Sequence, residues 1–176
     1  MTAQDPVTPA DATLAGFLQS VALAVADVYD KVIALLGDSA KPMATTFQNH
    51  HKEHAVALAI QAGSASVTLP NQALTLVLAA RLQTVTDERG ALTFAFGVEH
   101  QVTATYASTL TTLTSPDVVR LVATILTTVS GHAGVLGSSA GLTPTAVFPD
   151  GALQGATVGD GSDPKLGFDP ASFPVN

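Results

Sequence analysis

The chain has 176 residues, of which 47% are hydrophobic and only 12% charged, and its formal net charge is −7. This length fits one domain with a full hydrophobic core. Seven Lys and Arg residues are too few for the cationic cluster that nucleic-acid binding needs, and the lack of cysteine excludes a disulfide framework, a thiolate metal site and a cysteine nucleophile. A surface this poor in charge favours burial in a homo-oligomer or a larger protein assembly.

Residues 1–10 form an N-terminal lead-in rich in Pro and Thr. It has neither the basic region nor the apolar region of a signal peptide. Two interpretations follow for localisation. Either the protein is cytoplasmic, or a leader was removed before this numbering and the protein is exported to the cell envelope.

Two long helices are predicted in the first third of the chain. The first begins at the cap residue Thr8 and runs to about Leu36, where Gly37 ends it. Its apolar stripe follows three-four spacing and consists of Leu18, Ala22, Val25, Tyr29, Val32 and Leu36. The second runs from about Lys41 to Ala62. Its stripe contains two histidines and consists of Ala44, Phe47, His51, His54, Leu58 and Gln61.

A shorter connecting helix, capped by Asn71, is predicted over 71–86, and a third long helix over 90–113. The stripe of that third helix consists of Leu92, Ala95, Glu99, Val102, Tyr106, Leu110 and Leu113. Ser115 followed by Pro116 is a strong start signal for a fourth long helix. Its stripe consists of Val118, Val122, Ile125, Val129, His132 and Leu136.

Residues 118–137 are apolar enough to raise the alternative of a membrane span. Arg120, Ser130, His132 and several threonines are costly to insert into a bilayer. We therefore predict a bundle helix here and no membrane span.

The helices form two antiparallel pairs, because the turns within each pair are short and the connection between the pairs is long. This pattern predicts an all-α fold over residues 11–141: an antiparallel four-helix bundle of the ferritin-like type, with a crossover connection that carries a short helix. Residues 142–176 are predicted to form an irregular C-terminal tail rich in Gly, Pro and Asp. The tail is either disordered or docked, through its apolar residues, on its own bundle or on a neighbouring subunit.

Four ionisable residues fall on the apolar stripes and form a candidate metal site: His51, His54, Glu99 and His132. A carboxylate-bridged di-iron bundle takes a Glu from each of two helices and a Glu-x-x-His pair from each of the other two, so that i,i+3 side chains reach one metal site. His51 and His54 keep that spacing but place a histidine where the carboxylate is expected. The alternative interpretation is that these are core histidines satisfied by hydrogen bonds, with Glu99 paired to one of them.

Three segments resemble the bacterial ferritin-like domain proteins that are often exported to the cell envelope. They are Phe47–Ala55, Val98–His100 leading to Tyr106, and Ile125–Leu126 followed by His132–Gly137. The resemblance covers roughly residues 8–141 and leaves the tail outside. It implies that His51, His54, Glu99 and His132 are inherited ligand positions. It also implies that the glutamates expected at positions 22 and 129 have been replaced by Ala22 and Val129.

Two functional hypotheses follow, of which the first is the predicted function and the second is its alternative. In the first, the bundle has lost its di-iron chemistry and is a non-catalytic structural or partner-binding protein, with no cofactor. In the second, it is a metalloprotein that holds a single zinc, iron or copper ion through the residual His and Glu side chains. No catalytic residues are predicted under either hypothesis.

Overall fold

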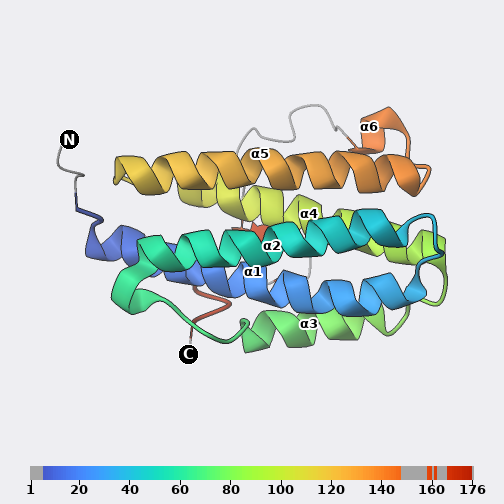
Figure 1. Cartoon of the computed structure of the whole chain (residues 1–176), viewed down its shortest axis with the longest axis horizontal. Helices are drawn as coiled ribbons and strands as arrows, with labels where there is room; N and C mark the ends of the chain where they lie inside the picture. The colour runs from blue at the N-terminus through green and yellow to red at the C-terminus, as the bar shows by residue number, and fades with distance from the viewer. Residues whose placement is uncertain (1–5, 148–157, 160, 162–165, 176) are drawn as a thin grey trace.

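The protein is an elongated bundle of four long helices in a computed structural model, which describes residues 6–147, 158–159, 161 and 166–175 (Figure 1). The four helices are α1 (Pro9–Leu35), α2 (Lys41–Ala62), α4 (Glu88–Leu110) and α5 (Pro116–Ser139). α1 packs along α2 and α4 along α5, while fewer contacts join the two pairs. This arrangement confirms the predicted all-α bundle.

The connection between α2 and α4 carries a short 3-10 turn, η1 (Gly63–Ala65), and the helix α3 (Gln72–Leu82). Asn71 caps α3, because its side-chain oxygen accepts a hydrogen bond from the Leu74 amide at 3.1 Å. α3 packs against α1. The predicted crossover with a short helix is therefore present.

Several helix boundaries differ from those expected from the sequence. α3 ends at Leu82 instead of extending to residue 86, and α4 ends at Leu110 instead of residue 113. α4 begins at Glu88 and not at residue 90, because the Asp87 carboxylate accepts the Gly90 amide hydrogen at 2.7 Å and so caps the helix.

The predicted stripes form the core between the helices. Those of α1 and α5 are buried along their whole length. α2 ends where predicted because Gly63 adopts a positive φ of 54°, which residues with a side chain rarely adopt. Helix periodicity thus identified the inward faces of α1 and α5 correctly, whereas four residues of the other two predicted stripes are only half-buried: His54, Gln61, Leu110 and Leu113.

By length and composition, α1 and α5 pass the criterion for a membrane-spanning helix, with a mean hydropathy of 1.4 each. Of the apolar window, 72% is buried within the structure in α1 and 33% in α5. Core helices of bundles satisfy the same criterion. The absence of a membrane span therefore stays a prediction.

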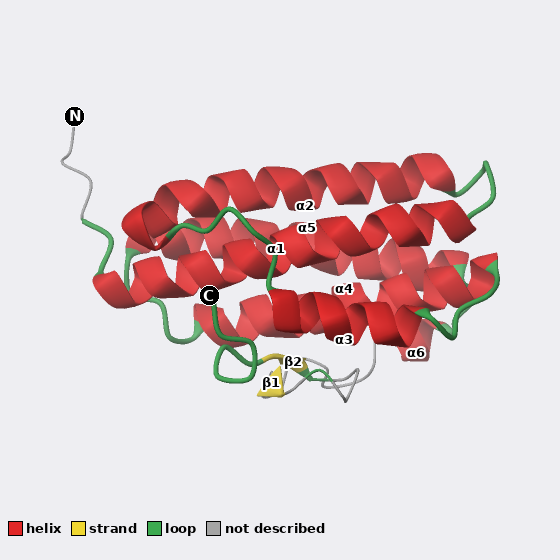
Figure 2. Ribbon diagram, turned by 90° about the horizontal axis from the view of Figure 1, so that it is seen from below, coloured by secondary structure: helices red, strands yellow, loops and turns green. Residues whose placement is uncertain are grey.

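The described part of the C-terminal tail docks on the protein's own bundle. The short strands β1 (Val158–Gly159) and β2 (Gly167–Phe168) pair in parallel and lie beside the bundle (Figure 2). The Phe168 amide donates to the Thr105 hydroxyl of α4 at 2.7 Å, and Asn71 Nδ2 donates to the Phe173 carbonyl at 2.9 Å. Phe168 and Phe173 are 0% and 2% exposed. Residues 148–157, 160, 162–165 and 176 of the predicted tail, and residues 1–5 of the lead-in, lie outside the described residues.

Candidate metal centre

Three of the four predicted ligand residues meet inside the bundle. His51 of α2, Glu99 of α4 and His132 of α5 each offer a ligand atom, and these atoms lie within 4.8 Å of one another. The relative exposures of the three residues are 0%, 0% and 3%. Each helix contributes one side chain because each residue lies on the stripe that faces the common core.

The Glu99 carboxylate is the centre of this cluster. Its Oε1 accepts a hydrogen bond from the Tyr29 hydroxyl at 2.6 Å and lies 2.8 Å from His51 Nε2 and 3.4 Å from His132 Nδ1. Its Oε2 is buried and has no hydrogen-bond partner among the described residues. One carboxylate oxygen is therefore crowded with polar neighbours while the other retains unused lone pairs.

His132 is held from two sides. Its ring stacks on Phe47, with 4.0 Å between ring centroids and 20° between planes. Its Nε2 lies 2.9 Å from Nδ1 of His50, a half-buried residue of α2. These contacts orient His132 so that Nδ1 faces Glu99.

His54 lies beside the cluster but is not one of the three residues whose ligand atoms converge. Its ring centroid is 5.9 Å from that of His51, and the two rings are almost perpendicular, at 85°. Burial and, to a smaller extent, the neighbouring His51 lower the pKa of His54 to about 4, so its imidazole is neutral at pH 7. Its Nδ1 is buried without a hydrogen-bond partner in the described structure.

Two further residues belong to the site although they were not in the predicted ligand set. Tyr29 is buried on the stripe of α1, as expected, and its hydroxyl donates a hydrogen bond to Glu99. His50 lies next to the stripe of α2 and contacts His132. The sequence signal for Tyr29 was its place on the first stripe. His50 carried no such signal, because it lies one residue away from the stripe position of His51.

The surroundings fix the charge of the site. Burial alone would raise the pKa of Glu99, but interactions with His51 and His132 lower it well below 4.5, so the side chain is a carboxylate. Burial, and then the Glu99 charge, raise the pKa values of Tyr29 and Tyr106 above 10.0, so both keep their protons. The site is therefore one buried anion surrounded by imidazoles and phenols.

Several buried polar atoms at the site lack a hydrogen-bond partner in the described structure. They are His51 Nδ1, His54 Nδ1, Glu99 Oε2, Tyr106 Oη and His132 Nδ1. Buried polar atoms are normally paired, since an unpaired one costs about 1–3 kcal/mol. Imidazole and carboxylate groups with free lone pairs are the ligands that zinc, iron and copper accept. The His51–Glu99–His132 group could therefore hold a metal ion.

Comparisons with known proteins agree with this architecture. A family model described as the ferritin-like domain matches residues 13–141, from the first turns of α1 to just beyond the end of α5. Neither the curated proteins nor the solved structures gave a match. The match covers most of the chain and coincides with the observed bundle; the chain belongs to the ferritin-like domain family.

Proposed function

We propose that this protein binds one transition-metal ion between α2, α4 and α5, through His51, Glu99 and His132. The observation that carries the proposal is the convergence of these three donors in a dry interior, where Glu99 Oε2 and His132 Nδ1 have no hydrogen-bond partner in the described structure. His132 Nδ1 and Glu99 Oε1 are 3.4 Å apart. Ligand atoms about 2.0–2.1 Å from a tetrahedral zinc ion are separated by roughly 3.3 Å, so little movement is needed there.

The donor set supports one ion and not a di-iron pair. A di-iron bundle uses four carboxylates, whose negative charges offset two cations. Here the stripe positions 22 and 129 carry Ala22 and Val129, both fully buried in the core. The chain has three glutamates, and the two besides Glu99 are the exposed Glu53 and the half-buried Glu88, neither of which is in the cluster. This shortage of buried negative charge supports the proposal that di-iron chemistry has been lost.

A bound ion would join three helices at one point. Because the ligands are brought together by folding, the free energy of metal binding adds to the free energy of unfolding. The expected consequence is a higher thermal midpoint in the presence of the metal.

The second candidate is a non-catalytic structural or partner-binding bundle. It is favoured by the hydrogen bonds that Tyr29 and His51 already make with Glu99, which pair the buried carboxylate without any ion. Under this hypothesis the cluster is a buried hydrogen-bond network that joins α1, α2 and α4, and adding metal does not change the thermal midpoint.

The test is metal titration of protein purified without added metal, with zinc, copper and, under anaerobic conditions, ferrous iron, followed by elemental analysis. We expect one ion per chain in the wild type. Glu99→Gln, His51→Ala and His132→Ala should each weaken binding by more than about 100-fold, which exceeds the usual loss from changing a residue behind a ligand. His100→Ala is the matched control, because His100 is half-buried on α4 but lines a different part of the surface.

Circular dichroism establishes that each variant is folded. Two ions per chain would contradict the single-ion proposal. A wild type that binds none of the three metals and keeps the same thermal midpoint would contradict metal binding and support the structural or partner-binding role. His54→Ala tests whether His54 is a fourth ligand, as expected from the sequence. If only the other three residues bind the metal, this variant should retain near wild-type affinity.

A further inference from the structure

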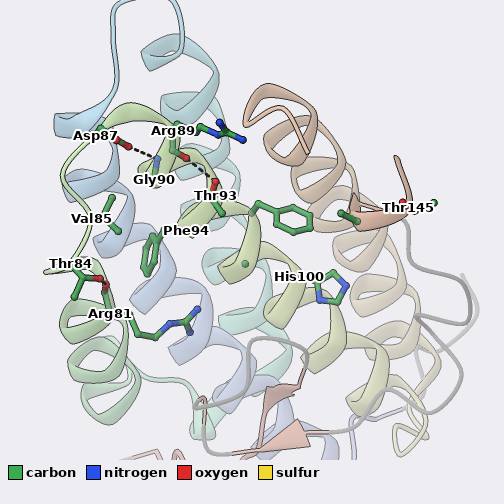
Figure 3. A pocket seen from close by; sticks show the side chains of 13 residues that line it. Arg81, Thr84, Val85, Asp87, Arg89, Gly90, Thr93, Phe94, His100 and Thr145 are labelled. Atoms are coloured by element: carbon green, nitrogen blue, oxygen red, sulfur yellow. Dashed lines mark hydrogen bonds between the residues drawn. The ribbon is translucent and has the colours of Figure 1, made fainter. Parts of the chain in front are cut away.

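A large groove lies on the outer side of α4, away from the metal centre. It encloses about 1290 Å³ and is lined mainly by apolar surface from the end of α3, the α3–α4 turn, α4 and α6 (Pro144–Val147). Figure 3 shows Phe94 and Val85 on its walls, with Arg81 below them and Thr145 across from α4. None of the residues that line the groove belongs to the His51–Glu99–His132 group, so the two sites are separate.

Glycine opens the floor of this groove. A Cβ atom at Gly97 would lie 3.7 Å from Arg81 Nη2, in ordinary van der Waals contact with that guanidinium. Glycine inside a helix is less favourable than alanine by about 1 kcal/mol. A glycine on the floor therefore lets the Arg81 guanidinium lie close to α4, at some cost to helix stability.

Arginine side chains line the groove, although the net charge of the chain is −7. Two of the three arginines of the chain, Arg81 and Arg89, line it. Neither forms an ion pair with any residue that the structure describes. The lining carboxylate, Asp87, accepts the Gly90 amide hydrogen as the cap of α4.

Arg81 is the better placed of the two arginines. Its guanidinium carbon lies 5.6 Å from the centre of the Phe94 ring, and its Nη1 donates to Gln101 Oε1 at 2.6 Å. These contacts fix the half-buried guanidinium beside apolar surface while leaving other N–H groups to bind an anion. A fixed guanidinium at an apolar wall is suited to a ligand with an anionic head and a hydrocarbon chain.

We propose that this groove binds a single-chain aliphatic carboxylate, with the carboxylate on Arg81 and the chain along Phe94, Val85 and the Gly97 floor. A neutral hydrocarbon would leave the positive charge of Arg81 without a counter-ion. A small, highly charged ligand would leave the apolar walls exposed to water. The proposal does not depend on the metal centre.

The test is isothermal titration of the full chain with monomeric octanoate, decanoate, dodecanoate and tetradecanoate. Each added methylene should lower Kd about twofold to fourfold, on the basis of about 0.8 kcal/mol for a fully buried methylene, until the chain fills the groove. Dodecanol, which lacks the negative charge, should bind at least about tenfold more weakly than dodecanoate.

Two pairs of variants separate charge from shape. Arg81→Gln should weaken dodecanoate binding about tenfold or more and leave dodecanol binding unchanged, whereas Arg120→Gln, which removes the third arginine from the exposed surface of α5, should change neither. Gly97→Leu should fill the floor and abolish binding of both ligands. Gly131→Leu is its control, because a side chain at Gly131 on α5 meets nothing within 4 Å.

Equal dodecanoate binding by wild type, Arg81→Gln and Gly97→Leu would overturn the proposal. So would the absence of saturable dodecanoate binding to the wild type. Binding to anionic phosphatidylglycerol vesicles without binding to monomeric dodecanoate would show a membrane-contact surface in its place and would also overturn it.

Discussion

The hydroxyl of Tyr29 donates a 2.6 Å hydrogen bond to Oε1 of Glu99, which joins α1 to α4 across the bundle core. Both side chains are buried, at 1% and 0% exposure, so water competes with neither. Because Glu99 is a carboxylate, this is a charge-assisted hydrogen bond of the stronger kind.

Tyr29→Phe should therefore lower the free energy of unfolding by about 1.5–3 kcal/mol, as expected for a hydrogen bond to a buried charged group. Urea denaturation measures the change. Tyr106→Phe is the matched control, since the Tyr106 hydroxyl is buried without a partner in the described structure and its removal should be nearly neutral or slightly stabilising. Equal losses in the two variants would show that the bond to Glu99 contributes nothing specific.

His50 is expected to set the proton position of His132. For His132 Nδ1 to ligate a metal, its proton must be on Nε2, which then donates to His50 Nδ1 at 2.9 Å. His50→Ala should weaken metal binding by about 10–100-fold, and His50→Gln, which restores an acceptor, should recover part of the loss. Competition titration with a chromophoric chelator measures both values. Lys52→Ala, at an exposed position of the same helix, should leave affinity unchanged.

A second buried carboxylate ties the beginning of α1 to the α4–α5 turn. Asp11 is 1% exposed, and its Oδ2 accepts hydrogen bonds from the Ser115 amide at 2.6 Å and the Thr114 amide at 3.1 Å. Asp11→Ala should cost about 1.5–3 kcal/mol of stability at pH 7, because it leaves these donors unpaired. Asp38→Ala, whose carboxylate is fully exposed beside Lys41, should change stability by less than about 0.5 kcal/mol.

The same carboxylate predicts a pH dependence. Burial would raise the pKa of Asp11, but hydrogen bonds from Ser115 and Thr114 outweigh it and lower that pKa below 3.8. The unfolded chain then binds the proton at a higher pH than the folded protein does. The stabilisation is present above pH 3.8 and is lost as the pH falls through the lower folded value. Denaturation of wild type and Asp11→Asn at a series of pH values measures their difference in stability. This difference should shrink as the pH falls below 3.8. A difference that stays constant would contradict a lowered pKa of Asp11.

Substitution by alanine should change the stability of the protein in opposite directions at two glycines, Gly167 in the tail contact and Gly131 on α5. A Cβ atom at Gly167 would lie 2.5 Å from the Thr105 backbone nitrogen, so Gly167→Ala should force β2 away from α4 and destabilise the protein by about 1–3 kcal/mol. Gly131→Ala on α5 meets no atom within 4 Å and should stabilise the helix by about 0.5–1 kcal/mol. Thermal unfolding followed by circular dichroism measures both shifts. A stabilised Gly167→Ala would show that the tail does not pack closely in solution.

The sequence by itself determined the helices and their inward faces. Caps such as Thr8 and Asn71, and stripes at three-four spacing, depend on neighbours within one or two helical turns, which are fixed by local geometry. The ferritin-like resemblance placed His51, Glu99 and His132 among the inward ligand positions, and these residues do converge.

Tertiary structure decided which of those inward residues touch. Periodicity gives the direction of a side chain around its own helix, but not its height relative to a neighbouring helix or the distance between helix axes. His54, one turn from His51, therefore falls beside the convergent group, whereas His50, outside the predicted stripe, reaches His132. The Tyr29–Glu99 bond joins residues 70 positions apart, and the Phe168–Thr105 bond joins residues 63 positions apart. Contacts of that range leave no local pattern in the sequence.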